Sequence, residues 1–223
     1  MAIQAKNLHS TKVTAPLALL VAAMPLLTYG CAAEPSGASG APGAVLVSDG
    51  YGSGAGFKGY WYTYKDDGGS SIKPECGARS APCFMGAARI CVSGEGSQVQ
   101  MGMFSTYWGA GVGWNLNQAT SPPNPVLAIG LKGKSTIAVT LDMKTTSPLR
   151  MKLKVAGDTT DYCANLSPGL NTIPLSGITS ECWMSGGDPI AADAMVEALQ
   201  FQIPTTDGSS TPFDFCITSL SIK

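Results

Sequence analysis

The feature that most constrains the fold is an alternation of apolar and polar residues in short segments. Apolar residues occupy every second position in 137–141, 151–155 and 199–203, so one face of each segment can enter a core. Clusters such as SPPNP, LSPG and SGGDP separate the segments. Short strands with turn residues between them predict an all-β fold, an antiparallel β-sandwich or jelly roll. Only residues 190–198 suggest a short helical turn.

The carboxyl-terminal stretch FDFCITSLSI changes its parity. Its apolar positions are odd-numbered as far as Ile217 and even-numbered from Leu220 onward. A strand with a β-bulge near Thr218 or Ser219 has this pattern. We expect this terminal strand to pair with the opening strand, AVLVSD.

Residues 1–31 have the features of a secretory signal peptide. Lys6 and Lys12 precede an uninterrupted apolar run at 15–27, and no acidic residue comes before it. The run is well short of the roughly 20 residues that a membrane-spanning helix needs. We therefore predict export of a chain that does not itself span a membrane.

The stretch LLTYGCAA resembles a bacterial lipoprotein processing site, in which a small residue precedes a cysteine that becomes lipidated. This resemblance makes Cys31 the predicted lipidation site and places the protein on the outer cell surface. Cleavage after Ala33 is the alternative, and it would give a freely secreted protein. Residues 32–43 are predicted to be a flexible tether, and residues 44–223 a single β-sandwich domain.

Six of the seven cysteines remain once Cys31 is assigned to the leader boundary. In an exported domain they predict three disulfides. Two pairs each bracket one turn-rich segment, and the third follows by elimination. The predicted pairs are Cys163–Cys182, Cys76–Cys83 and Cys91–Cys216. Zinc is the competing interpretation, but the chain has no C-x-x-C pair and its only histidine, His9, lies in the leader.

Composition excludes several functional classes. Without Lys6 and Lys12, 12 basic and 15 acidic residues remain, and no basic cluster suggests nucleic acid as a partner. A mature chain without histidine excludes Ser-His-Asp and Cys-His catalysis. GAGFKG and GKST resemble nucleotide-binding loops, but a strand rather than a helix is expected after each. Carboxylate chemistry and non-catalytic binding remain.

The stretch YWYTYKDDGG, residues 60–69, combines aromatic rings with carboxylates. Strand alternation puts Tyr62 and Tyr64 on one face and Trp61 on the other, and only one face can be core. Rings on the other face either pack under a loop or are exposed. Exposed rings stack well on the apolar faces of sugars, while nearby Asp and Asn side chains bind hydroxyls. The stretch therefore suggests a glycan site.

The adjacent carboxylates Asp66 and Asp67 point to opposite faces, so a glycosidase would need a partner from elsewhere. Loop candidates for that partner are Asp158, Asp161, Asp188 and Glu181. The alternative is a turn in which an aspartate caps backbone donors.

A second aromatic cluster is YWGAGVGWNLN, where parity makes Trp114 a core residue. Trp108 could either cover the edge of the sandwich or lie open to a ligand. Trp183, next to Cys182, is expected to pack over a disulfide rather than to edge a cleft.

The order of GYWYTYKDDGGSSIKP, MFSTYWGAGVGWNLN, DYCANLSPGLNTIPLS and FDFCITSLSI resembles the jelly-roll, galactose-binding-like carbohydrate-binding modules of bacterial secreted proteins and cellulases. The resemblance covers nearly all of the chain after the tether, and it implies this fold and a polysaccharide ligand. The final strand of that family usually carries paired acids where Thr218 and Ser219 stand. A structural calcium ion is therefore not supported, and no other cofactor is expected.

These observations favour a non-catalytic polysaccharide-binding module on an exported protein. The predicted sugar-binding residues are Trp61, Tyr62, Tyr64, Asp67 and Trp108. One alternative is a structural or adhesion lipoprotein in which all of these rings are core. The other is a carboxylate-dependent glycosidase or polysaccharide lyase. The expected partner is a polysaccharide or glycan, and a membrane is contacted only through the lipid anchor.

Overall fold

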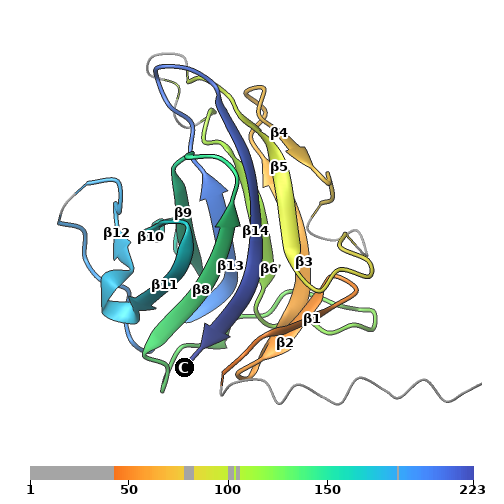
Figure 1. Ribbon diagram of the computed structural model, residues 1–223. Coiled ribbons are helices and arrows are strands. Elements are labelled where there is room, and N and C mark those ends of the chain that lie inside the picture. The colour runs from red at the N-terminus through yellow and green to blue at the C-terminus, as the bar shows by residue number, and fades with distance from the viewer. Residues whose placement is uncertain (1–42, 78–82, 100–102, 104–105, 185) are drawn as a thin grey trace, which may run out of the picture. The chain divides into compact units, whose positions relative to one another are not determined.

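Two antiparallel β-sheets pack face to face and enclose the core (Figure 1). The computed structural model describes residues 43–77, 83–99, 103, 106–184 and 186–223. The larger sheet has the order β1 (Leu46–Ser48), β2 (Tyr51–Gly54), β3 (Phe57–Lys65), β6 (Ala110–Asn115), β13 (Met195–Ile203), β9 (Leu149–Val155), β10 (Tyr162–Leu166) and β12 (Thr179–Ser180), and β7 (Ile129–Gly130) also pairs with β13. The smaller sheet has the order β11 (Gly169–Pro174), β8 (Thr136–Met143), β14 (Thr211–Ile222), β5 (Ile90–Gly96) and β4 (Ser71–Lys73). The predicted all-β sandwich is confirmed.

The last strand, β14, has the predicted irregularity. Its register against β8 shifts between Ile217 and Ser219, which is where the apolar positions change parity. The expected pairing with the opening segment holds only for its first residues, where the backbone N–H of Val45 donates a 2.8 Å hydrogen bond to the Leu220 carbonyl. Ala44 forms an isolated bridge with Ser221, whereas β1 joins β2 in the larger sheet. The chain turns back at residues 49–50 into β2 and β3, and this turn draws the opening segment into the larger sheet.

The predicted helical turn at 190–198 is also wrong. Met195–Ile203 forms β13, a central strand of the larger sheet, and its inward-facing Leu199 and Phe201 are fully buried. A 3₁₀ turn at Leu175–Gly177 is the only helix among the described residues. Within that part of the chain, no helix is long and apolar enough to span a membrane.

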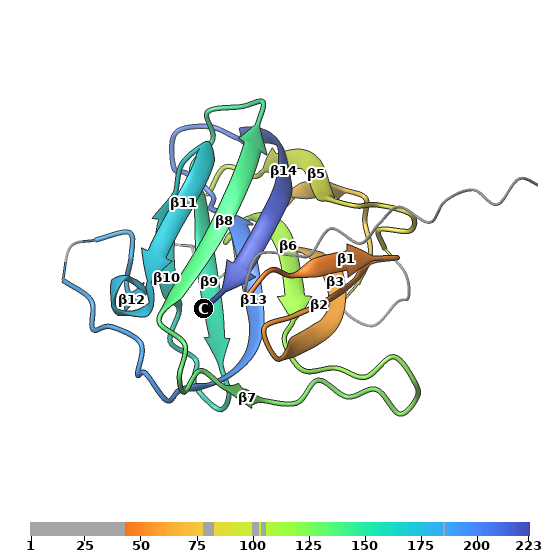
Figure 2. The same ribbon diagram turned by 60° about the horizontal axis from the view of Figure 1, so that its bottom comes forward.

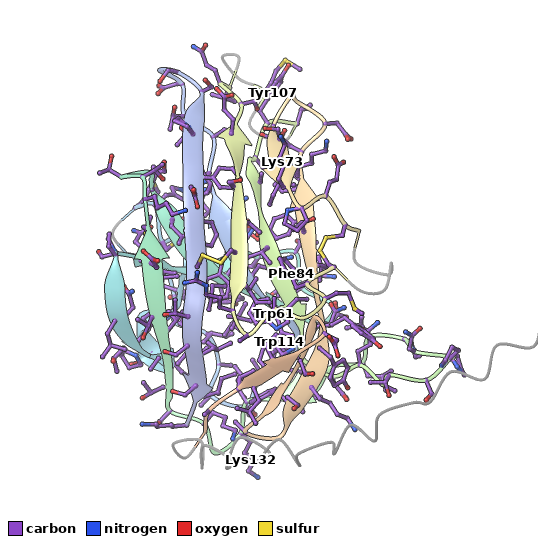
Figure 3. The ribbon with its side chains drawn as sticks, turned by 45° about the vertical axis from the view of Figure 1, so that its right-hand side comes forward. Trp61, Lys73, Phe84, Tyr107, Trp114 and Lys132 are labelled. Atoms are coloured by element: carbon purple, nitrogen blue, oxygen red, sulfur yellow. A yellow bond between two sulfur atoms is a disulfide. The ribbon has the colours of Figure 1, made fainter. Side chains whose placement is uncertain are left out.

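The core is built around two indole rings. Trp61 of β3 and Trp114 of β6 are register partners, and their rings stack with centroids 5.7 Å apart. Figure 3 shows them together between the two layers. Phe201 of β13 continues the stack, with its centroid 6.3 Å from that of Trp61. Alternate residues of three neighbouring strands of the larger sheet therefore supply the centre of the core.

Three disulfides join the described cysteines in the pairing expected from the sequence. Cys91 of β5 and Cys216 of β14 are register partners that lie 125 positions apart in the chain. Cys163 of β10 pairs with Cys182 after β12, and Cys76 pairs with Cys83 between β4 and β5. Cys31, the leader and most of the tether lie outside the described residues. The boundaries predicted for them remain predictions.

Candidate functional site

The two faces of β3 have different roles. Trp61 points into the core and is 2% exposed, so its predicted contact with sugar is wrong. The reason is the strand geometry, because neighbouring residues face opposite sides and the stack with Trp114 takes Trp61 inward. Tyr62 and Tyr64 face the other way, onto the outer face of the larger sheet. The candidate site is built on that face.

The two tyrosine rings lie across glycines of the neighbouring strand. Tyr62 pairs with Gly113 of β6, and Tyr64 pairs with Gly111. A Cβ atom at Gly111 would lie 2.8 Å from the Tyr64 hydroxyl, and one at Gly113 would collide with the Tyr62 ring. Only glycine leaves room for these rings. The ring of Trp108, from the segment before β6, stacks on Tyr64 with centroids 5.6 Å apart.

Two glutamines of β13 hold this aromatic row in place. Gln200 pairs with Gly113, and its side-chain amide donates a 3.0 Å hydrogen bond to the Tyr62 hydroxyl. Gln202 donates a 2.8 Å hydrogen bond to the backbone carbonyl of Trp108. Residues that are opposite each other in a sheet share a face. The outer face therefore carries the tyrosine rings of β3 and, beyond the glycines of β6, the glutamine amides of β13.

The next strand, β9, adds cationic side chains to the same face. Lys152 is the register partner of Gln200, and Arg150 is that of Gln202. Lys152 forms a 2.7 Å ion pair with Asp161. The Arg150 guanidinium lies over the Trp183 ring, 5.5 Å from its centroid. Burial lowers the pKa of both cations, and Asp161 opposes this effect.

Three hollows with shared lining residues lie along this face, and together we call them the outer-face groove. The first, about 590 Å³, includes Tyr62, Asn115, Gln118, Lys154 and Glu197 in its lining. The second, about 410 Å³, includes Tyr64, Trp108, Lys152, Lys154, Asp161 and Gln200. The third, about 710 Å³, includes Trp108, Arg150, Asp161, Asn165, Trp183 and Gln202. Lys154 borders the first two hollows, while Trp108 and Asp161 border the last two.

The phenols of the groove remain protonated well into alkaline solution. Burial raises the pKa of Tyr62, although the hydrogen bond from Gln200 works in the opposite direction. Burial raises the pKa of Tyr64 further, aided by the negative charge of Asp161. The Tyr64 hydroxyl is buried and has no hydrogen-bond partner among the described residues. It is therefore a neutral donor whose hydrogen-bonding capacity is not used by any described residue.

The aspartate pair after β3 is a turn, as the simpler interpretation held. Asp66 is 2% exposed, and its carboxylate accepts hydrogen bonds from the backbone N–H groups of Gly68, Ser70 and Gly109. Asp67 is exposed in the turn and borders none of the three hollows. The structure therefore does not bring Asp67 to the groove, because the turn directs it into solvent.

The structure brings together Tyr62, Tyr64 and Trp108 among the predicted residues. It adds Arg150, Lys152, Gln200 and Gln202, and it also places there Asp161, which the sequence offered only as a partner carboxylate for a glycosidase. The sequence contained a signal for some of these, because polar residues alternate with the buried residues of β9 and β13.

Trp183, expected to pack over a disulfide, is 55% exposed and borders the third hollow, so that expectation is wrong. A 3.0 Å hydrogen bond from the Asn165 amide to the Cys182 carbonyl holds its loop against β10.

No protein-family model and no curated protein matches this chain. Among solved structures, the chain is similar in fold to a family 11 carbohydrate-binding module. That module belongs to the cellulosomal cellulase Lic26A-Cel5E of Clostridium thermocellum, with 12% identity, a TM-score of 0.46, and coverage of 82% of this chain and 95% of the module. The solution structure of CtCBM11 gives 14% identity, a TM-score of 0.42, and coverage of 82% and 96%. This likeness concerns the fold alone.

Proposed function

We propose that this protein is a non-catalytic polysaccharide-binding module whose ligand lies in the outer-face groove. The observation that carries the proposal is the stacked pair of Tyr64 and Trp108, which lies beside hydrogen-bonding side chains on a recessed sheet face. Sugars present apolar ring faces and hydroxyl edges, so a site for them needs both kinds of group. The groove supplies rings from Tyr64, Trp108 and Trp183, and amides from Gln200 and Asn165.

The lining of the outer-face groove also suits an oligosaccharide. Its three hollows share lining residues, and an aromatic ring borders each of them. A chain of sugars could occupy successive hollows with a ring contact in each. The carboxylates Asp161 and Glu197 are held in ion pairs with Lys152 and Lys154, which suits binding more than proton transfer.

Export through the leader and anchoring through Cys31 belong to the same proposal. Three disulfides favour an extracellular location, because such bonds persist in oxidising compartments. A surface module held by a flexible tether could reach polysaccharide outside the cell. Mass spectrometry of the native protein tests the anchor, since a diacylglyceryl mass at Cys31 is expected, and a mature amino terminus at Glu34 would contradict it.

Binding of the purified full chain to a panel of insoluble and soluble polysaccharides tests the function. Sedimentation and affinity electrophoresis should detect at least one ligand, and Trp108→Ala should weaken its binding at least tenfold. Leu170→Ala is the control, because Leu170 is an exposed apolar side chain on β11 of the other sheet. Absence of binding across a broad panel would contradict the proposal and favour a structural role.

A further inference from the structure

Arg150 is a cation without an anionic partner in the groove. Four ion pairs join described residues, and Arg150 belongs to none of them. Its neighbour Lys152 takes the carboxylate of Asp161 at 2.7 Å, and Lys154 takes that of Glu197 at 2.8 Å. Asp161 still favours the charged form of Arg150, but the Oδ2 atom of Asp161 is paired with Lys152.

Asp158, the other carboxylate that borders the second hollow, does not neutralise the charge of Arg150. Asp158 is in the turn after β9, and its carboxylate accepts a 2.8 Å hydrogen bond from the backbone N–H of Thr160. Asp158 borders the second hollow and not the third. Among the described residues, the carboxylate nearest in role to a partner for Arg150 in the third hollow is therefore Asp161, which Lys152 already binds.

The guanidinium is also short of hydrogen bonds. Its Nε atom is buried and has no partner among the described residues. Burial lowers the Arg150 pKa, which reflects the cost of removing the cation from water. Arg150 is half-buried, so its charge is only partly solvated, and an anion bound at the exposed part of the guanidinium would offset some of that cost.

The surroundings of Arg150 are suited to an acidic sugar. A guanidinium presents a planar fork of donors that matches the two oxygens of a carboxylate. The rings of Trp108 and Trp183 border the same hollow as Arg150, and the Asn165 side chain is its register partner on β10. The buried Tyr64 hydroxyl, in the neighbouring second hollow, has no partner among the described residues, and it is near enough that the Arg150 charge affects its pKa.

We infer that the third hollow of the outer-face groove binds a uronate residue of an acidic polysaccharide, with the sugar carboxylate paired to Arg150 and the sugar ring against an indole. This inference rests on the proposed function and names its ligand class. The unpaired guanidinium in a ring-lined hollow carries it.

The test compares uronans with matched neutral ligands. Polygalacturonate, alginate and glucuronan are each assayed beside their carboxyl-reduced forms, which keep the backbone linkages and lose the charge. Dextran sulfate and neutral cellulose complete the panel. The full chain should bind at least one uronan at least tenfold more tightly than its reduced form. Arg150→Gln should remove that preference, so that the variant binds the uronan no more tightly than its reduced form.

Two variants control for other effects. Lys144→Gln removes an exposed cation paired with Asp214, away from the groove, and should keep the preference for uronan. Arg150→Lys keeps the charge but loses the planar fork, so an intermediate affinity is expected. The comparison of natural with reduced ligand needs no variant, so it stands even if Arg150→Gln fails to fold.

The outcomes separate the two proposals. Binding to neutral polysaccharide with equal affinity for uronan and reduced uronan would overturn the uronate inference and leave the proposed function standing. Binding to dextran sulfate alone would also overturn it, because any polyanion attraction would then be unrelated to a carboxylate site. Absence of binding to the whole panel would overturn both.

Discussion

The carboxylate of Asp66 accepts a 2.6 Å hydrogen bond from the backbone N–H of Gly109, 43 positions further along the chain. Its other oxygen accepts bonds from the backbone of Gly68 and Ser70. One buried acid thus ties the turn after β3 to the residue that follows Trp108. The position of the Trp108 ring over Tyr64 therefore depends on a residue that does not line the groove.

Replacing Asp66 with Ala should lower the free energy of unfolding by about 2–4 kcal/mol, because three backbone donors lose a charged acceptor. It should also weaken polysaccharide binding, since the residue after Trp108 loses the carboxylate bond and Trp108 keeps only the support of Gln202. Denaturant unfolding and affinity electrophoresis measure the two effects. Asp67→Ala is the matched control and should change stability by less than about 0.5 kcal/mol. Equal stability of the two variants would contradict the role given to Asp66.

Trp61 and Trp108 should respond oppositely to truncation. Trp61→Ala removes a fully buried ring from the core stack and should cost about 3–5 kcal/mol of stability. Trp108→Ala should reduce affinity at a nearly constant thermal midpoint, because its ring is only partly buried. Measuring midpoint and affinity for both variants distinguishes the roles. A large fall in midpoint for Trp108→Ala would place that ring in the core instead.

The two groove phenols should differ when each loses its hydroxyl. Tyr64→Phe removes a buried hydroxyl without a partner, so the free energy of unfolding should stay level or rise by about 1 kcal/mol. Tyr62→Phe leaves the Gln200 amide without its acceptor and should lower stability by about 1 kcal/mol. If the Tyr64 hydroxyl serves the ligand, Tyr64→Phe also binds more weakly. Loss of stability in both variants would show that the Tyr64 hydroxyl has a partner in solution.

Tyr64 should also affect stability at high pH. Burial raises its pKa in the folded protein well above the ordinary value of about 10. The contribution of protonated Tyr64 to the free energy of unfolding is therefore intact below pH 10 and is lost as the pH rises beyond that value. Burial lowers the pKa of Lys152, so the contribution of Lys152 to the free energy of unfolding increases as the pH approaches 10.5. Comparing wild type with Tyr64→Phe cancels the Lys152 effect. The variant should lose stability less steeply above pH 10, and parallel curves would contradict this.

Gly113 should not tolerate a methyl group. A Cβ atom there would collide with the Tyr62 ring, so Gly113→Ala should cost about 1–3 kcal/mol and displace the ring from the groove. Gly208→Ala is the control, because a Cβ atom at Gly208 meets nothing within 4 Å. Thermal unfolding of both variants checks the difference. A stable Gly113→Ala with unchanged binding would show that the ring can move without penalty.

Local patterns in the sequence predicted the strands well. Parity alone located the irregularity of β14 near Thr218, and the shared parity of Val112, Trp114 and Leu116 placed Trp114 in the core. The pattern in 190–198 was misread as a helical turn because its alternation is clear only from residue 199 onward. The segment that includes Met195 becomes a strand because β13 pairs with β6 on one side and β9 on the other. No local sequence pattern specifies that pairing.

The candidate site was harder to predict because β3 carries rings on both faces. Which face becomes core depends on its partner strand, where Trp114 meets Trp61 and glycines face Tyr62 and Tyr64. That pairing joins segments about 50 positions apart, and alternation does not specify it. Arg150 and Gln202 were missed for the same reason, since their place beside Trp108 follows from the strand order. Asp67 was predicted to bind sugar only because it follows the aromatic residues in the chain, and the turn directs it away from the groove.

The bond between Cys91 and Cys216 encloses most of the residues that shape the groove. Trp108, Arg150, Trp183 and Gln202 all lie between the two cysteines in the chain. Figure 2 shows the chain between β6 and β7, also within this interval, as a long loop extending from the sheets. A single cut in that loop by an extracellular protease would open the covalent ring without releasing a fragment. Both pieces would stay joined through the disulfide, so a nicked molecule could keep its groove assembled.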